Sequence, residues 1–264
     1  MYKKIDSTQN SLIKQCLVLL EKSRERRKQG VFLVEGQREI QLAIEGGYEI
    51  QTLLFCAPIF LNNINQYATA ATQIIEISLE VYQKLAYRKT TEGVLAIVKT
   101  KELTLNKLEF KSKNPLLLIA EAPEKPGNIG ALLRTADAAN VDAIVISNPL
   151  TDLYNPNIIR SSVGGVFTVP IATGTSEEVI DYLKQHDISI YAAVLQESVA
   201  YDTIDFKKGS ALVVGAESTG LSQGWRTAST AKIRIPMHGK IDSMNVSVAA
   251  GILLFEAKRQ RKSS

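Results

Sequence analysis

The sequence predicts an α/β protein in which strands of a parallel sheet alternate with helices. Short apolar runs such as 116–121 (LLLIAE) and 211–217 (ALVVGAE) are typical of strands that are buried on both faces of a parallel sheet. Amphipathic stretches of helical spacing separate them. A polar, lysine-rich stretch at 101–113 divides two such series. We therefore expect a small α/β domain over 1–100, a linker over 101–113 and a second domain over 114–264.

In the first domain, the pattern predicts a helix over 7–28, because apolar residues recur on one stripe from Leu12 to Leu20. A second helix is expected over 37–47, where Gly46 and Gly47 end it. Apolar runs predict strands, and these cover residues 31–36, 50–56, 73–78 and 93–99.

In the second domain, the same criteria predict six strands, at 116–121, 142–147, 167–172, 188–194, 211–217 and 231–237. Helices are expected over 128–140 and 176–186 and from Asn245 onward. This last helix is apolar around most of its circumference, which is typical of a helix buried against several partners or in a subunit interface.

Composition narrows the functional classes. Hydrophobic residues make up 45% of the 264 residues and charged residues 22%, as in ordinary globular proteins. The two cysteines, Cys16 and Cys56, have no CxxC spacing or histidine cluster beside them, so we expect no metal site. Free thiols and the absence of an apolar leader favour a cytoplasmic protein. No apolar run approaches the ~20 residues needed to span a bilayer, so no membrane association is expected.

The charge is concentrated at the two ends of the chain. Residues 1–30 hold eight basic and three acidic residues, and residues 256–264 hold four basic and one acidic residue, although the whole chain carries only +4. A polyanion such as RNA would explain these patches, and an ordinary solvated helix face would explain them equally well. The candidate RNA-binding residues are Arg24, Arg26, Arg27, Lys28 and Arg160.

Three segments combine glycine with polar residues directly after an apolar strand, at 121–135, 213–222 and 235–245. In open α/β sheets, ligands bind beyond the carboxyl ends of the strands. The glycines permit close backbone approach or positive φ, although turn chemistry explains any single one of them. Neither GxGxxG nor GxxxxGK[ST] is present, so these loops do not predict a dinucleotide or ATP site.

The polar residues of these loops each allow a structural interpretation. Asn128 would make a good N-cap for the helix that follows it, and Asn245 would do the same for the last helix. Glu217 could pair with a cation. Arg134 stands among small and apolar residues, so we expect it to be buried against a carboxylate or a phosphate. Ser243 and Asn245 lie at the mouth of an apolar helix, where a cap and a ligand pocket are both open interpretations.

Taken together, the loops resemble the three motifs of the SpoU (TrmH) family of RNA ribose 2′-O-methyltransferases, in the SPOUT superfamily. The first motif, N-x-G-x-x-x-R-T, is met over 128–135, and the second, G-x-E-x-x-G-L, over 215–221. The third is met over 235–249, with Met244 in place of a leucine of similar volume. Residues 160–170 also look like the family. Residues 32–47 resemble the substrate-binding domain that often precedes it, an α/β fold also found in RNA-binding ribosomal proteins.

This resemblance implies a parallel-sheet catalytic domain threaded into a trefoil knot, an exception to the rule against knots, and a homodimer whose site borrows from the partner subunit. The implied cofactor is S-adenosylmethionine, and no metal is required. The implied cofactor-binding residues are Gly215, Ile235 and Met244, together with Leu221, Pro236 and Gly239. The implied catalytic residues are Asn128, Arg134, Glu217, Ser243 and Asn245.

In the implied reaction, a ribose 2′-oxygen attacks the sulfonium methyl group. Arg134 would assist removal of the hydroxyl proton, or would clamp phosphate and stabilise the developing alkoxide. Guanidinium has a very high pKa, so the first role needs unusual surroundings. Asn128, Ser243 and Asn245 would orient the ribose, and Glu217 would organise the loops. The domain order favours 23S ribosomal RNA over transfer RNA. A base methyltransferase of the same superfamily and a non-catalytic RNA-binding protein are the alternatives.

Overall fold

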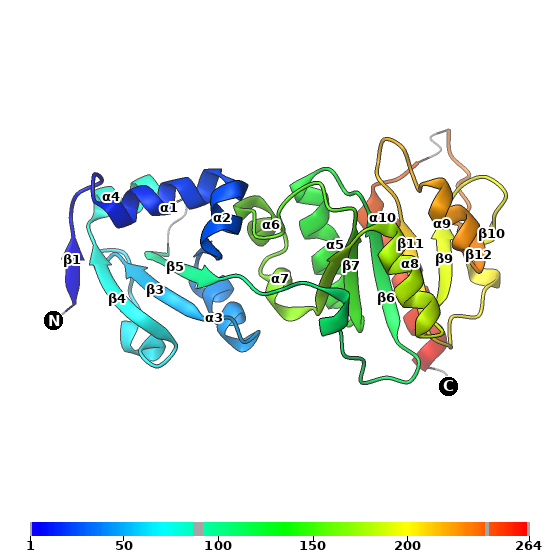
Figure 1. Cartoon of the computed structure of the whole chain (residues 1–264), viewed down its shortest axis with the longest axis horizontal. Helices are drawn as coiled ribbons and strands as arrows, with labels where there is room; N and C mark the ends of the chain where they lie inside the picture. Colours follow the sequence, from blue (N-terminus) through cyan, green and yellow to red (C-terminus); the bar gives the residue numbers. More distant parts are fainter. Residues whose placement is uncertain (1, 87–91, 241–242, 263–264) are drawn as a thin grey trace. The chain divides into compact units, whose positions relative to one another are not determined.

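The computed structural model describes residues 2–86, 92–240 and 243–262. Its contacts divide the chain into two compact units (Figure 1). The N-terminal unit comprises residues up to 101 together with 152–168, and the C-terminal unit comprises 102–151 together with 169 onward. Residues 152–168, which the sequence-based boundaries place in the second domain, therefore pack with the first unit.

The N-terminal unit is built on a five-stranded mixed sheet in the order β1-β4-β3-β5-β2. β3 and β1 are parallel to β4, whereas β5 is antiparallel to β3 and β2. The strands are β1 (Lys3–Ile5), β2 (Val31–Glu35), β3 (Ile50–Phe55), β4 (Ala71–Ile77) and β5 (Val94–Lys99). The helices are α1 (Ser11–Glu21), α2 (Ser23–Gln29), α3 (Gln37–Glu45), α4 (Leu79–Leu85), α6 (Pro156–Ser161) and α7 (Gly165–Thr168).

The prediction of a single helix over 7–28 is wrong, because the chain forms two helices, α1 and α2, separated at Lys22. Asn10 caps α1 by accepting the N–H of Leu12, and Lys22 is extended, with φ −110° and ψ 107°. The break places Arg26 of α2 beneath the end of α1, where its guanidinium donates to the free carbonyl of Leu19 at 2.6 Å. Periodicity does not reveal this break, because the apolar stripe lies in α1, whereas the one buried residue of α2 is the charged Arg26.

A buried aromatic cluster explains why residues 152–168 belong to this unit. Tyr154 stacks on Phe32 with ring centroids 4.2 Å apart, and Phe167 meets the edge of Tyr48 at 5.2 Å. All four rings are at most 9% exposed. The strand expected over 167–172 is therefore only partly correct. Phe167 lies in helix α7, which ends at Thr168, and the strand begins later, at Ile171.

The C-terminal unit contains a seven-stranded sheet in the order β10-β12-β9-β11-β6-β7-β8, in which each neighbouring pair is parallel. The expected parallel α/β architecture is thus confirmed, whereas the trefoil knot stays a prediction. The strands are β6 (Leu116–Glu121), β7 (Ala143–Ser147), β8 (Ile171–Gly174), β9 (Ser189–Ala193), β10 (Val199–Ala200), β11 (Ser210–Val214) and β12 (Ala231–Arg234). Sequence analysis did not predict β10 or, in the first unit, β1.

Helices cover both faces of this sheet (Figure 1). α8 (Ser176–Gln185) and α9 (Gln223–Ala228) pack on one face, over a core that includes Leu117, Val145 and Val213. α5 (Pro126–Ala138) and α10 (Val246–Lys262) pack on each other and against β6, β7 and β11. No helix in the described part of the chain is long and apolar enough to cross a membrane.

The polar segment expected to be a linker is partly folded onto the C-terminal unit. It contains a short 3-10 helix, η2 (Leu105–Lys107), and Thr104 forms a bridge with Thr173 of β8. Leu105, Leu108 and Phe110 pack against the same core as α8. The apolar residues of this segment are therefore partly buried against the core, whereas its lysines are exposed.

Candidate active site

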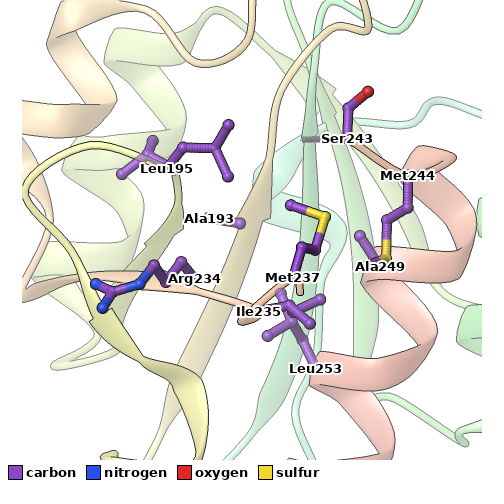
Figure 2. Close-up of a pocket in the computed structure, with 10 residues that line it drawn as sticks. Ala193, Leu195, Arg234, Ile235, Met237, Ser243, Met244, Ala249 and Leu253 are labelled. Carbon is purple, nitrogen blue, oxygen red and sulfur yellow. The ribbon is translucent and has the colours of Figure 1, made fainter. Parts of the chain in front are cut away.

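A cavity of about 170 Å³ lies beyond the carboxyl ends of β9 and β12, against the start of α10 (Figure 2). Ile235 and Met237 line it from the segment after β12, Met244 and Ala249 from the α10 side, and Leu195 from the segment after β9. The other lining residues are Ala193, Val194, Arg234, Ser243 and Leu253. The cavity is therefore mostly apolar, with one hydroxyl and one guanidinium at its rim.

The three motif loops are joined by a chain of side-chain hydrogen bonds. Asn245 donates from Nδ2 to Oδ1 of Asn128 at 3.2 Å, and Asn128 donates from Nδ2 to Oε1 of Glu217. These residues are 89 and 117 positions apart in the sequence. The three motif loops thus meet at Asn128, Glu217 and Asn245, and Asn245 directly follows the cavity-lining residues Ser243 and Met244.

Asn245 also caps α10. Its Oδ1 accepts the backbone N–H of Ser247 at 2.9 Å and the hydroxyl of Ser247 at 2.6 Å, and the helix begins at Val246. The expected N-cap at Asn245 is confirmed. The expected N-cap at Asn128 is wrong, because α5 begins at Pro126 and Lys125 is its cap residue. Proline fits the first helical turn, since its missing N–H would have no partner there.

The loop of the second motif, residues 215–221, is a closed turn. Gly220 has φ +67°, and its N–H donates to the carbonyl of Ala216 at 2.9 Å. A Cβ on Gly215 would lie 2.3 Å from the carbonyl carbon of Gly220, so only glycine fits there. This turn presents Glu217 toward Asn128 and buries Leu221, which is 4% exposed.

Lys125 is a site residue that sequence analysis missed. Its Nζ lies 2.7 Å from Oε2 of Glu217, so both oxygens of this carboxylate are engaged. The hydrogen bond from Lys125 to Glu217 and the negative charge of Glu217 raise the pKa of the Lys125 ammonium. The sequence held a weak signal for it, because Lys125 stands directly before the proline that starts α5.

Two arginines differ from expectation in their solvent exposure. Arg134 lies on α5 and is exposed, with no hydrogen bond or ion pair to another described residue, so its expected burial is wrong. Arg26, expected to contact RNA, is 2% exposed and pairs with Asp152 at 2.5 Å. Its guanidinium is thus used inside the N-terminal unit, and we withdraw it from the RNA-binding set.

The remaining predicted residues fall into three groups. Ile235, Met244 and Ser243 line the cavity, whereas Gly215 and Leu221 shape the neighbouring loop. Exposed positions outside the cavity lining hold Pro236, Gly239, Arg24, Arg27, Lys28 and Arg160. Residues 241 and 242 of the third motif lie outside the described residues. Within the described residues, no group of three or more metal-ligating side chains occurs.

The cavity suits the adenine end of S-adenosylmethionine. Thioether and aliphatic side chains such as Met237, Met244 and Ile235 suit a flat, apolar adenine ring. Leu195, at the mouth of the cavity, is 54% exposed, which is unusual for a large apolar side chain. A bound adenine ring would cover this apolar surface. Ser243 adds a hydroxyl for the polar part of such a molecule.

Proteins of known activity are similar to this chain along nearly its whole length. It is 29% identical to the 23S rRNA (uridine(2479)-2′-O)-methyltransferase of Streptomyces viridochromogenes, over 97% of this chain and 92% of that protein. It is 28% identical to the 23S rRNA (guanosine(2553)-2′-O)-methyltransferase RlmP of Bacillus subtilis, over 97% and 99%. The crystal structure of an AdoMet-bound rRNA methyltransferase from Sinorhizobium meliloti matches with a TM-score of 0.89 and 28% identity, covering 98% of each chain.

Family models agree with the two series of elements. An MRM3-like substrate binding domain matches residues 10–96, and the SpoU rRNA Methylase family matches residues 115–255. The second match covers more than half of the chain and contains all three motif loops. The chain therefore belongs to the SpoU rRNA methylase family, with an MRM3-like substrate binding domain before the catalytic part.

Proposed function

We propose that this protein transfers the methyl group of S-adenosylmethionine to a ribose 2′-hydroxyl of 23S ribosomal RNA. The observation that carries the proposal is the hydrogen-bond chain from Asn245 through Asn128 to Glu217, next to an apolar cavity lined by Ile235 and Met244. Relatives that match both parts of the chain are named for 2′-O-methylation of 23S rRNA, which favours ribosomal over transfer RNA.

The cofactor supplies an activated methyl group, so the protein's task is to orient and activate the ribose hydroxyl. Asn128 and Asn245 are held by each other and by Glu217, which fixes their amides before the substrate arrives. Ser243 lines the cavity and adds a hydroxyl to it. Fixed dipoles of this kind lower a barrier because they need not reorganise during the reaction.

Arg134 acts as a phosphate clamp that stabilises negative charge on the attacking oxygen. Its guanidinium is exposed and forms no ion pair with other described residues, so it remains available to an RNA phosphate. The alternative, removal of the hydroxyl proton by Arg134, would need a desolvated setting that the single chain does not provide.

The N-terminal unit supplies electrostatic contacts to the RNA backbone. Arg24, Arg27 and Lys28 are exposed on α2, and Arg160 is exposed on α6. Such contacts release counterions, so RNA affinity should fall steeply with salt. An affinity independent of salt between 50 and 200 mM would contradict this part of the proposal.

The active form is a homodimer in the cytoplasm. Val248 and Phe255 lie seven residues apart on one face of α10 and are 54% and 53% exposed, and a second subunit would cover them. Phe255→Asp should therefore yield a monomer in light scattering. A dimer that persists in this variant would place the interface elsewhere.

The central test combines activity with cofactor binding. Arg134→Ala and Asn245→Ala should abolish methyl transfer to 23S rRNA, while calorimetry shows largely unchanged binding of S-adenosylmethionine. Full activity of purified Arg134→Ala would discard its assignment. Ribose-methylation mapping in cells with and without the protein should show one lost site in 23S rRNA, and a loss confined to transfer RNA would contradict the proposed substrate.

A further inference from the structure

Glu121, at the end of β6, is a buried carboxylate without a cationic partner among the described residues. It is 5% exposed, and both of its oxygens accept hydrogen bonds. Oε1 accepts the hydroxyl of Ser176 at 2.8 Å, and Oε2 accepts the backbone N–H of Ser222 at 2.8 Å. Burying a carboxylate with only neutral donors is costly, so its place at the ligand end of the sheet requires a reason.

Ser176, the first residue of α8, links this carboxylate to three further groups. Its Oγ accepts the indole N–H of Trp225 at 2.9 Å and the amide N–H of Asn148 at 2.8 Å. The hydroxyl of Ser147 lies 3.1 Å away. Trp225 and Ser147 are fully buried. Glu121 is thus the only charged acceptor in this described network, and its removal would leave the Ser176 hydroxyl and the Ser222 N–H without this acceptor.

The network ends on the loop that carries Glu217. Ser222 directly follows residues 215–221, so its bond to Glu121 fixes the far end of the loop to β6. The near end is fixed by the close backbone approach of Gly215 to Gly220. Between these two anchors, Glu217 reaches Asn128, which lies seven residues after Glu121 on the segment that leaves the same strand.

We propose that Glu121 is a positioning residue for methyl transfer, which holds the 215–221 loop on β6 so that Glu217 can orient Asn128. This inference rests on the proposed function. Glu121 does not reach the cavity lining itself, so it acts through the loop and not on the substrate.

Glu121→Gln is the direct test, because it keeps size and shape but turns one acceptor into a donor. The new amide N–H₂ must face either the N–H of Ser222 or the crowded Oγ of Ser176. We expect kcat, expressed per cofactor site titrated by calorimetry, to fall roughly 10- to 100-fold, the range for loss of a hydrogen bond to a charged acceptor. KM for RNA should change less than about twofold, since Glu121 is buried in the C-terminal unit and a change there leaves the residues proposed to contact RNA intact.

Trp225 provides a direct readout of the network, whereas the fall in kcat at a nearly unchanged KM is the result that a purely structural role would not give. Trp225 is the only tryptophan of the chain, so its fluorescence reports on this network alone. Glu121→Gln should shift its emission in the folded protein. Glu124→Gln is the matched control, because Glu124 is an exposed carboxylate that accepts the hydroxyl of Ser218 in the same loop at 2.7 Å. It should leave kcat within about twofold and the emission unchanged.

The outcomes separate the possibilities. A wild-type kcat per titrated site in Glu121→Gln would overturn the inference. A fall in total activity that disappears when activity is expressed per titrated site would overturn it as well. If Glu121→Gln does not fold, Ser176→Ala replaces it, with the same expected signs and a smaller loss. A wild-type protein that binds the cofactor but methylates no 23S rRNA would refute the proposed function and this inference with it, whereas an active wild type equalled by Glu121→Gln refutes this inference alone.

Discussion

Asn245→Asp separates the two roles that the structure gives to one side chain. The oxygen of Asn245 caps α10, and its Nδ2 donates to Asn128. Aspartate keeps the capping oxygen and is as good an N-cap as asparagine. Its negative charge is also favourable at a helix N-terminus. The free energy of unfolding should therefore change by less than about 0.5 kcal/mol.

The effect on the site should be much larger. In Asn245→Asp, an oxygen would face Oδ1 of Asn128 at about the present separation of 3.2 Å. If Asn128 turned its amide over to repair this contact, its oxygen would face the Glu217 carboxylate instead. One acceptor–acceptor contact remains in either orientation. We expect a loss of about 1.5–3 kcal/mol in transition-state stabilisation, or roughly 10- to 150-fold in rate.

Single-turnover methyl transfer with radiolabelled cofactor and thermal unfolding measure the two effects on the same preparation. Asn10→Asp is the matched control, because Asn10 caps α1 by the same contact, to the N–H of Leu12 at 2.9 Å. It should change neither stability nor rate appreciably. Wild-type methyl transfer by Asn245→Asp would refute the reasoning about the hydrogen-bond chain, and a loss of stability as large as that of Asn245→Ala would refute the reasoning about the cap.

Three further predictions concern loop geometry, the C-terminal helix and pH. Gly215→Ala must open its loop by about 1.1 Å, since the new Cβ would lie 2.3 Å from backbone whose ordinary contact begins at 3.4 Å. Calorimetry should show at least tenfold weaker cofactor binding, whereas Gly127→Ala, with nothing within 4 Å, should bind normally. Arg261 donates to the carbonyls of residues 114, 206 and 208 at 2.5–2.8 Å, so Arg261→Ala should cost about 2–3 kcal/mol in urea unfolding, with Arg261→Lys recovering less than half. Hydrogen bonds from Arg259 and then Gln260 lower the pKa of Glu256 to about 2 from an ordinary 4.5, so its stabilising contribution is complete above pH 4.5 and is lost as pH falls toward 2. The difference in melting temperature between wild type and Glu256→Gln should shrink across that window, and a constant difference would contradict the assignment.

The strands were predictable because burial on both faces leaves a direct trace in composition. The strand predicted at 116–121 is β6, and the one predicted at 211–217 is β11, which ends earlier, at Val214; the two are neighbours near the centre of the sheet. Short edge strands leave no such trace, and β10 has only two residues. The break at Lys22 was equally hidden, because it depends on one extended backbone angle and on a buried guanidinium whose partner, Asp152, is 126 residues away.

The site was predictable as a set of loops but not as a set of contacts. The three loops were expected to form one site, and hydrogen bonds join them at Asn128, Glu217 and Asn245. Arg134 was expected to be buried because its sequence neighbours are small and apolar. Those neighbours occupy the other faces of α5, however, and helical periodicity leaves Arg134 on the exposed one. Local composition thus describes a helix as a whole and not the side of it on which one residue lies.

A cap and a pocket were alternatives for Asn245 only while its side chain was treated as a single group. An amide has an acceptor end and a donor end, and the structure uses both. The direction of the hydrogen-bond chain is fixed at its two ends, because the backbone N–H of Ser247 can only donate and the carboxylate of Glu217 can only accept. The amides of Asn128 and Asn245 must therefore both accept on the side of Ser247 and donate on the side of Glu217. Aspartate could cap α10 equally well, but it has no N–H to donate to Asn128, whereas the asparagine amide caps the helix with its oxygen and donates from its nitrogen.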